Sequence, residues 1–138
     1  MTYTIAKAGE RCGLTAHTLR FYDKEGLLPF VDRSPSGVRI FKESDFDWLR
    51  IITCLKDTGM SIKKIREFVD WAIEGDATIG KRLEFIREHK REVEQQLEQM
   101  KAHLETIDYK LHYYETALEA GTTAIHKNQN DEKKAEAV

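Results

Sequence analysis

A long helical repeat constrains the fold of this 138-residue chain more than any other feature. Apolar residues recur at alternating steps of four and three, interrupted only at Lys90: Ile79, Leu83, Ile86, Val93, Leu97, Met100, Leu104, Ile107, Leu111, Tyr114 and Leu118. This spacing is typical of a coiled coil. A helix of about 40 residues would be roughly 60 Å long, too long to bury its stripe against short helices. We therefore predict a homodimer; the alternative is a helix folded back on its own domain.

The rest of the sequence predicts short helices around one turn-rich segment, and therefore a mainly α fold. Glycines, prolines and serines mark residues 26–41 as extended or turning. Helices are predicted at 5–12, at 16–25 after a Thr15 cap, from near Ser44, whose hydroxyl can cap it, to Thr58, and at 62–74 after a Ser61 cap. The predicted units are 1–75, a coiled-coil dimerisation helix at 76–120 and a disordered tail at 121–138.

The charge of the chain is high, nearly balanced and unevenly distributed. Residues 1–71 carry 12 Lys and Arg against 10 Asp and Glu, whereas residues 72–138 carry 10 against 14. A mildly basic first half suits contact with a polyanion. Cys12 and Cys54 are too few for a disulfide framework, and the charged N-terminal segment is no signal peptide. We therefore expect a cytoplasmic protein with free thiols and no membrane partner.

The segment GLTAHTLRFYDKEGLL, residues 13–28, has the pattern of a helix-turn-helix. Gly13 provides the turn between two short helices, the second of which would enter the major groove of DNA. Leu19 and Phe21 are expected to pack in the core. The candidates for DNA contact lie on the same helix: His17 and Thr18 for base edges, Arg20 and Tyr22 for phosphates.

The next segment, RSPSGVRIF, predicts a two-stranded ribbon that turns at Ser36–Gly37. Arg33 and Arg39 would stand on opposite strands of this wing, where guanidinium groups suit phosphate contacts. The fourth helix opens with SIKKIR, so its first amides together with Lys63, Lys64 and Arg66 form a further candidate phosphate site. The alternative for these lysines is a solvated face.

Three consecutive segments together resemble the MerR family of transcription regulators. They are YTIAKAGERCGLTAHTLRFYDKEGLL, then R-x(5)-R-x-F, then DTGMSIKKI, within residues 3–68. The resemblance implies a winged helix-turn-helix homodimer whose long helices pair antiparallel on a pseudo-palindrome between promoter elements. It also implies that the dimer bends and untwists this spacer, so that RNA polymerase engages both elements. The family's DNA-contact positions fall on His17, Thr18, Arg20, Tyr22, Arg33, Arg39 and Lys63.

The sequence lacks the usual sensing groups of such regulators. Metal sensors have cysteines at the start of the long helix, where Thr78 and Ile79 stand here, and in a loop after it. An iron–sulfur sensor needs four clustered cysteines, and only a short tail stands where drug sensors append a ligand domain. His89, His103 and His112 have no ligand spacing and are expected to be surface polar residues. We predict no metal and no cofactor.

Cys54 is the remaining candidate sensor. In WLRIITCLKDTGMS it flanks the predicted core stripe, with Arg50 one turn before and Asp57 three residues after. Arg50 would favour the nucleophilic thiolate and Asp57 would oppose it, so the residues alone allow a packing or a reactive cysteine. The segment IITCLKDTGMSI resembles the short MerR subgroup that responds to aldehydes and thiol-reactive stress through one cysteine. The resemblance makes Cys54 the expected electrophile sensor; at Cys12 a small residue suffices.

Two further interpretations remain open besides sensing at Cys54. The chain could be an architectural dimer that bends DNA without sensing anything. It could also be a MerR-type regulator whose small ligand binds between the fourth helix and the long helix, near Phe68, Trp71 and Tyr113, with Cys54 inert. An enzyme is not expected, because the sequence holds no nucleophile–base pair and no phosphate loop.

Overall fold

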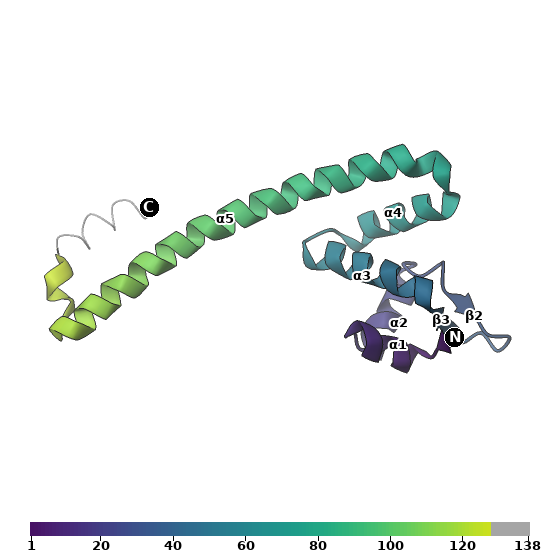
Figure 1. Cartoon of the computed structure of the whole chain (residues 1–138), viewed down its shortest axis with the longest axis horizontal. Helices are drawn as coiled ribbons and strands as arrows, with labels where there is room; N and C mark the ends of the chain where they lie inside the picture. Colours follow the sequence, from purple (N-terminus) through teal and green to yellow (C-terminus); the bar gives the residue numbers. More distant parts are fainter. Residues whose placement is uncertain (128–138) are drawn as a thin grey trace. The chain divides into compact units, whose positions relative to one another are not determined.

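The computed structural model describes residues 1–127, which form two compact units (Figure 1): Met1–Arg91, and a second unit from Glu92 onward. The elements of the first unit are, in order, β1 (Thr2–Tyr3), α1 (Ile5–Cys12), α2 (Ala16–Lys24), β2 (Asp32–Arg33), β3 (Arg39–Lys42), α3 (Glu43–Asp57), α4 (Ile62–Glu74), the 3-10 turn η1 (Asp76–Thr78) and the first turns of α5 (Ile79–Ala120). The second unit holds the rest of α5 and the 3-10 turn η2 (Thr123–His126). The predicted mainly α fold is confirmed.

The short helices begin and end at the residues that the sequence indicates. The Thr15 hydroxyl accepts a hydrogen bond from the Thr18 amide at 3.0 Å, and Ser61 accepts one from the Lys64 amide at 3.2 Å. Each side chain satisfies an amide that the helix itself cannot pair. Gly13, with φ of 70°, adopts the left-handed conformation that ends α1 and opens the turn to α2.

The start of α3 differs from the prediction by one residue, and its cap is different. We expected Ser44 to cap the helix, but α3 begins at Glu43. The Asp45 carboxylate instead accepts from the backbone amide of Lys42 at 2.9 Å and from the Lys42 ammonium at 3.0 Å. Asp45 is 1% exposed, so this carboxylate is a buried charge that is both hydrogen-bonded and paired.

The predicted wing is present and belongs to a larger sheet than expected. β2 and β3 pair antiparallel with Arg33 opposite Arg39, as predicted, and Gly37 turns the ribbon with φ of 86°. β1 pairs antiparallel with the other edge of β3, placing Tyr3 opposite Phe41. The strand order is therefore β1-β3-β2. Two residues of β1 are too few to give the alternating pattern by which a strand is recognised in sequence.

One core joins the sheet, the helix-turn-helix and α3 and α4. Its fully buried members include Leu19, Tyr22, Leu27, Phe41, Leu49, Ile52, Ile65 and Val69. Burying each such side chain contributes about 1.5–3 kcal/mol before conformational entropy is subtracted. The helix that would enter DNA is thus held by the same core as the wing.

The first turns of α5 pack inside the first unit, which the coiled-coil pattern did not predict. Phe85 stacks on Phe68 with ring centroids 5.5 Å apart and meets Trp71 edge-on at 5.4 Å. Ile86, which we assigned to the dimer stripe, packs partly buried against this core. The prediction failed here because a helix can present apolar residues on two neighbouring faces, and spacing alone does not say which partner covers each.

Further along α5 the predicted stripe is solvent-exposed in the single chain. Its members there are each more than half exposed: Leu97, Met100, Leu104, Ile107, Leu111, Tyr114 and Leu118. A monomer rarely leaves so long an apolar stripe in water, which favours a partner helix. No helix within residues 1–127 has the length and hydropathy needed to cross a membrane.

The segment after α5 contradicts the predicted disorder in its first part. The chain turns at Gly121, with φ of 74°, and forms η2. The His126 ring then packs on Tyr113 at 4.4 Å, and its Nε2 lies 2.6 Å from the Thr116 hydroxyl. These contacts order a segment whose composition alone suggested a solvated tail. The remainder of the predicted tail, residues 128–138, lies outside the described residues.

Candidate DNA interface and sensor cysteine

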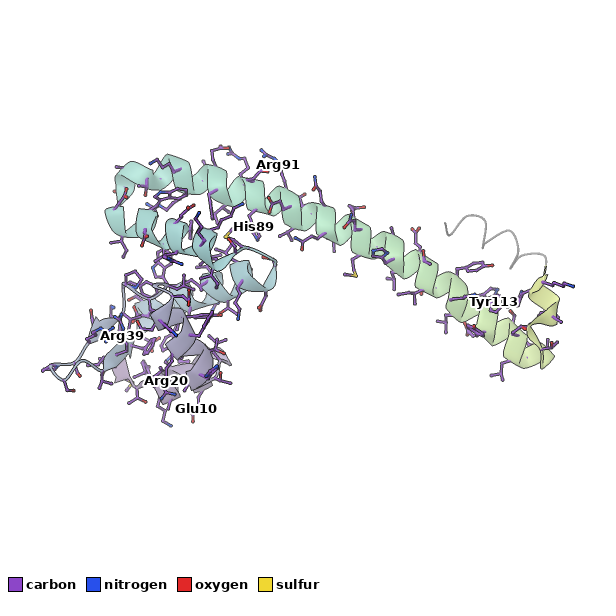
Figure 2. All side chains as sticks on the ribbon, turned by 180° about the vertical axis from the view of Figure 1, so that it is seen from behind. Glu10, Arg20, Arg39, His89, Arg91 and Tyr113 are labelled. Carbon is purple, nitrogen blue, oxygen red and sulfur yellow. The ribbon has the colours of Figure 1, made fainter. Side chains whose placement is uncertain are left out.

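The first turns of α2 present polar side chains to solvent. His17 and Arg20 are exposed, and neither makes an ion pair with any described residue. Arg20 is labelled in Figure 2. The Thr18 hydroxyl accepts from Thr15 at 2.9 Å, which leaves its own proton for an outside acceptor. The capped N-terminus and these three side chains together make a surface that suits the edge of a nucleic acid.

Tyr22 does not belong to this surface, which corrects the prediction of a phosphate contact. Its side chain is 1% exposed, in the centre of the core, and its hydroxyl lies 3.3 Å from the Thr53 hydroxyl on α3. Phe21, expected in the core, is instead 39% exposed. The two neighbours exchanged roles because the core stripe of α2 runs through Leu19 and Tyr22, three residues apart on one helical face.

The two wing arginines also differ from each other. Arg33 is about half exposed, donates to the Gly37 carbonyl at 2.9 Å at the turn of the ribbon, and lies 3.8 Å from the Asp23 carboxylate. Arg39 has a side chain only 18% exposed (Figure 2) and pairs with Asp23 of α2 at 2.7 Å. It also donates to the Val31 carbonyl. Arg39 therefore fastens the wing to α2, and its contact with phosphate stays a prediction.

The N-terminus of α4 carries the remaining predicted contact. Lys63 is exposed in the first turn, and no described residue pairs with it. Lys64 and Arg66 are exposed beside it, and the Arg66 side chain passes 3.5 Å from the position a Cβ would take on Gly26. The exposed cations on α2, the wing and α4 are thus presented by one packed unit.

Cys54 is exposed on α3, opposite the face that enters the core. Ile52 and Leu55 are 0% and 2% exposed, so the predicted core stripe runs through them, while Cys54 lies away from it rather than beside it. The packing role left open by the sequence therefore has no support within the single chain. The carbonyl of Cys54 accepts from the Thr58 hydroxyl at 2.7 Å, one turn along α3.

His89 of α5 reaches this same hydroxyl, and sequence analysis missed it. We expected a surface residue, but His89 is 8% exposed and its Nε2 lies 2.7 Å from Thr58 Oγ1 (Figure 2). The available signal was its position one turn after Phe85, on the face of α5 that packs against the core. A histidine within an apolar face indicates a buried hydrogen bond.

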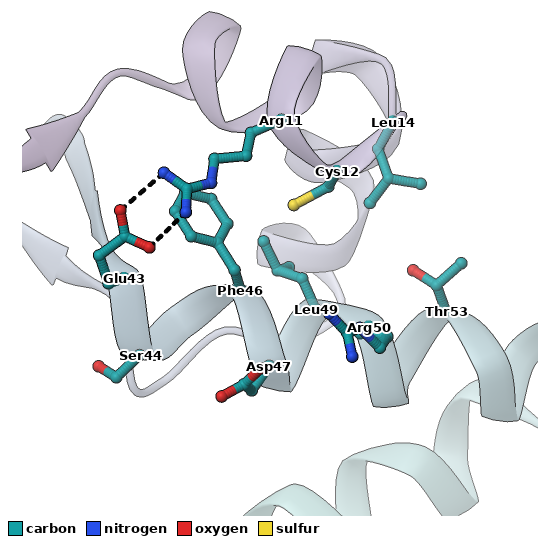
Figure 3. A pocket seen from close by; sticks show the side chains of 10 residues that line it. All are labelled: Arg11, Cys12, Leu14, Glu43, Ser44, Phe46, Asp47, Leu49, Arg50 and Thr53. Atoms are coloured by element: carbon teal, nitrogen blue, oxygen red, sulfur yellow. Dashed lines mark hydrogen bonds and ion pairs between the residues drawn. The ribbon is translucent and has the colours of Figure 1, made fainter.

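A cavity of about 640 Å³ lies between α1 and α3 (Figure 3). Arg11 and Glu43 form a bidentate pair at its edge, and Cys12 points into it while Cys54 does not line it. Burial raises the pKa of the Cys12 thiol, more than the charge of Arg11 lowers it. The Cys12 thiol therefore loses its proton less readily, and because the thiolate is the nucleophilic form, Cys12 is poorly suited to sense electrophiles.

Within residues 1–127 no group of three or more His, Cys, Asp or Glu side chains could hold a metal ion. The functional surface consists of a helix-turn-helix, a ribbon with an exposed arginine and a basic helix N-terminus. Together with a long helix whose apolar stripe is uncovered, these features define a winged-helix DNA-binding protein with a dimerisation helix.

The comparison with protein families assigns this class more closely. Residues 3–70 match the family described as MerR HTH family regulatory protein, and residues 46–109 match the one described as MerR, DNA binding. The chain belongs to the MerR family of transcriptional regulators, and it is a regulator rather than an enzyme. Regulators of this family act as homodimers and contact RNA polymerase.

Two curated relatives and one solved structure illustrate the similarity. An uncharacterized HTH-type transcriptional regulator of Haemophilus influenzae is 47% identical over 122 residues, 88% of this chain and 90% of that protein. The regulator AdhR of Bacillus subtilis is 37% identical over 87 residues, 63% of this chain and 62% of AdhR. The structure of HiNmlR, a MerR family regulator lacking the sensor domain and bound to promoter DNA, superposes with a TM-score of 0.83 at 46% identity, covering 89% of this chain and 98% of that one.

Proposed function

We propose that this regulator binds a promoter spacer as a homodimer and distorts it to control transcription. The crystal structure of HiNmlR on promoter DNA, at 46% identity, supports this DNA partner. The exposed cations of two copies would contact phosphates at both ends of a pseudo-palindrome, so that bending energy is offset by contacts at the ends. The two long helices would pair antiparallel through their exposed stripes. The cytoplasmic location belongs to the same proposal, because promoter DNA is the partner.

We further propose that Cys54 senses small electrophiles such as aldehydes, and that the regulated genes detoxify them. The single observation that carries this proposal is the exposed thiol on α3, whose opposite face enters the core that holds α2 and the wing. The thiolate sulfur would attack the carbonyl carbon of an aldehyde, forming a carbon–sulfur bond. The carbonyl π electrons move to oxygen, which takes a proton from water and gives a hemithioacetal. Similarity to AdhR and HiNmlR supports this assignment.

A non-covalent inducer near Phe68 and Trp71 is the weaker alternative. The Phe85 ring packs against both of these rings and occupies the space between them. A cavity of about 310 Å³ touches Phe68 on its other side, but Trp71 does not line it. Phe85 therefore occupies the part of this site that lies beside Phe68 and Trp71.

Transcription from the regulated promoter with and without formaldehyde tests the sensor. We expect Cys54→Ser to abolish the response while operator binding stays within about twofold of wild type, because an exposed side chain outside the DNA surface is replaced. Cys12→Ser is the matched control and should respond normally. Full induction of the Cys54→Ser protein would contradict sensing by this thiol and favour a non-covalent inducer.

A further inference from the structure

The Thr58 hydroxyl lies between the sensor turn and the long helix. It is 2.7 Å from the Cys54 carbonyl and 2.7 Å from His89 Nε2. Cys54 belongs to the last turn of α3 and Thr58 is the residue that caps its C-terminus, whereas His89 belongs to α5. All three residues are within the first compact unit.

Counting protons fixes the direction of both hydrogen bonds. A carbonyl oxygen only accepts, so the single hydroxyl proton of Thr58 is donated to the last turn of α3, to the Cys54 carbonyl at 2.7 Å and the Leu55 carbonyl at 3.2 Å. The hydroxyl oxygen must then accept from His89, whose Nε2 therefore carries a proton. His89 of α5 thus donates to the Thr58 hydroxyl, and the Thr58 hydroxyl donates to the backbone carbonyl of Cys54.

Burial gives this arrangement its rigidity. His89 is 8% exposed, and its neighbour one turn earlier, Phe85, stacks on Phe68 of α4. A hydrogen bond shielded from water is stronger than an exposed one, and a buried donor that loses its acceptor is penalised. The Thr58–His89 bond is partly buried, whereas the Thr58–Cys54 bond is exposed. A displacement of the Cys54 peptide that carries Thr58 with it therefore either moves the long helix or strains the partly buried bond.

We propose that His89 is a positioning residue that transmits modification of Cys54 from α3 to the dimerisation helix through Thr58. This inference rests on the proposed sensing by Cys54 and names the route by which it regulates. An adduct on the exposed sulfur adds bulk to the last turns of α3 and shifts the carbonyl of residue 54. Thr58 and His89 convert this local shift into a movement of α5, whose stripe joins the two copies.

The test separates sensing from transmission in the full-length dimer. His89→Leu removes the donor at similar size, Thr58→Val removes the hydroxyl, and His103→Leu places the same change at an exposed histidine of α5. We expect the first two variants to bind the operator normally and to lose induction by formaldehyde about fivefold or more, a typical coupling between sites. The control should respond like wild type. Alkylation of Cys54 by iodoacetamide, followed by mass spectrometry, should proceed at the wild-type rate in all three, since Cys54 is exposed and none of the substitutions changes it.

Conservative variants and a double mutant distinguish a loss of signal transmission from Cys54 to α5 from a general loss of protein stability. His89→Gln and Thr58→Ser keep the donor and the hydroxyl and should restore most of the induction. The His89→Leu/Thr58→Val pair should lose no more than either single variant, because both break one path. Full induction in His89→Leu and Thr58→Val, with none in Cys54→Ser, would overturn this inference and leave the sensor proposal intact. Full induction in Cys54→Ser would overturn both.

Discussion

At the scale of single residues, the recognition helix divides its side chains between DNA and core. Tyr22 and Arg39, both predicted to contact phosphates, are used inside the protein: one fills the core and the other pairs with Asp23. His17 and Arg20 keep their polar groups in solvent. Motif position identified the correct helix, but the choice between neighbouring residues depends on the rotation of that helix against α3, which local spacing does not specify.

Replacing Arg20 by Ala should weaken operator binding without unfolding the protein. Loss of a phosphate contact affects all sequences alike and lowers the salt dependence of binding, by about one unit of log K against log salt per contact removed. Binding measured by fluorescence anisotropy at several salt concentrations checks this. Lys81→Ala is a control, since this exposed lysine of α5 lies over the Trp71 ring rather than on the DNA surface. An unchanged salt dependence in Arg20→Ala would remove Arg20 from the interface.

Tyr22 should behave as a core residue. Tyr22→Ala opens a cavity and should cost about 3–5 kcal/mol of the free energy of unfolding. Tyr22→Phe loses only the long hydrogen bond to Thr53 and should change operator affinity little. Thermal unfolding and operator affinity, measured on both variants, show whether Tyr22 serves the core or contacts phosphate. A large loss of affinity in a stable Tyr22→Phe protein would restore the phosphate contact predicted from the sequence.

At the scale of elements, the helices were predictable where local chemistry decides them. Thr15, Ser61 and Gly13 act at the positions where caps and turns were expected. The elements that escaped prediction depend on distant partners. β1 exists because β3 offers it an edge, and the first turns of α5 are buried because α4 supplies Phe68 and Trp71. The Thr58–His89 contact escaped for the same reason, since the two residues are 31 positions apart in sequence.

The exposed stripe of α5 should be the dimer interface. Leu104→Glu places a charge at its middle and should shift the protein toward monomer and abolish operator binding, because burial of an unpaired carboxylate is penalised. Ala102→Glu adds the same charge off the stripe and should leave the dimer intact. Analytical ultracentrifugation of both variants measures the result. A dimeric Leu104→Glu protein would show that other residues hold the two copies together.

At the scale of the whole molecule, the pairing of two copies in the homodimer determines how many cations face the DNA. One copy presents Arg20, Arg33 and Lys63 as exposed cations, and the homodimer presents each of them twice. The acidic second half of the chain, with 10 basic against 14 acidic residues, adds no attraction for DNA. Affinity should therefore arise from a few contacts at two separated places.

The operator affinity of the wild-type dimer should fall steeply with salt. About six phosphate contacts predict a slope of log K against log salt of roughly −5. Titrations of a promoter fragment between low and moderate salt concentrations measure this slope. A slope near zero would mean that the exposed cations do not contact phosphates. A slope of half the expected size would mean that a single copy makes the contacts.

The pairing of Arg39 with Asp23 has a consequence for how operators can evolve. It ties the wing to the recognition helix, so the separation between groove contacts and flanking phosphate contacts is fixed within each half-site. Base substitutions can accumulate wherever neither part touches the DNA. Insertion or deletion of one base pair inside a half-site cannot be absorbed by moving the wing. New target genes should thus be recruited by point mutations in promoters, and half-sites of altered width should be absent from the regulon.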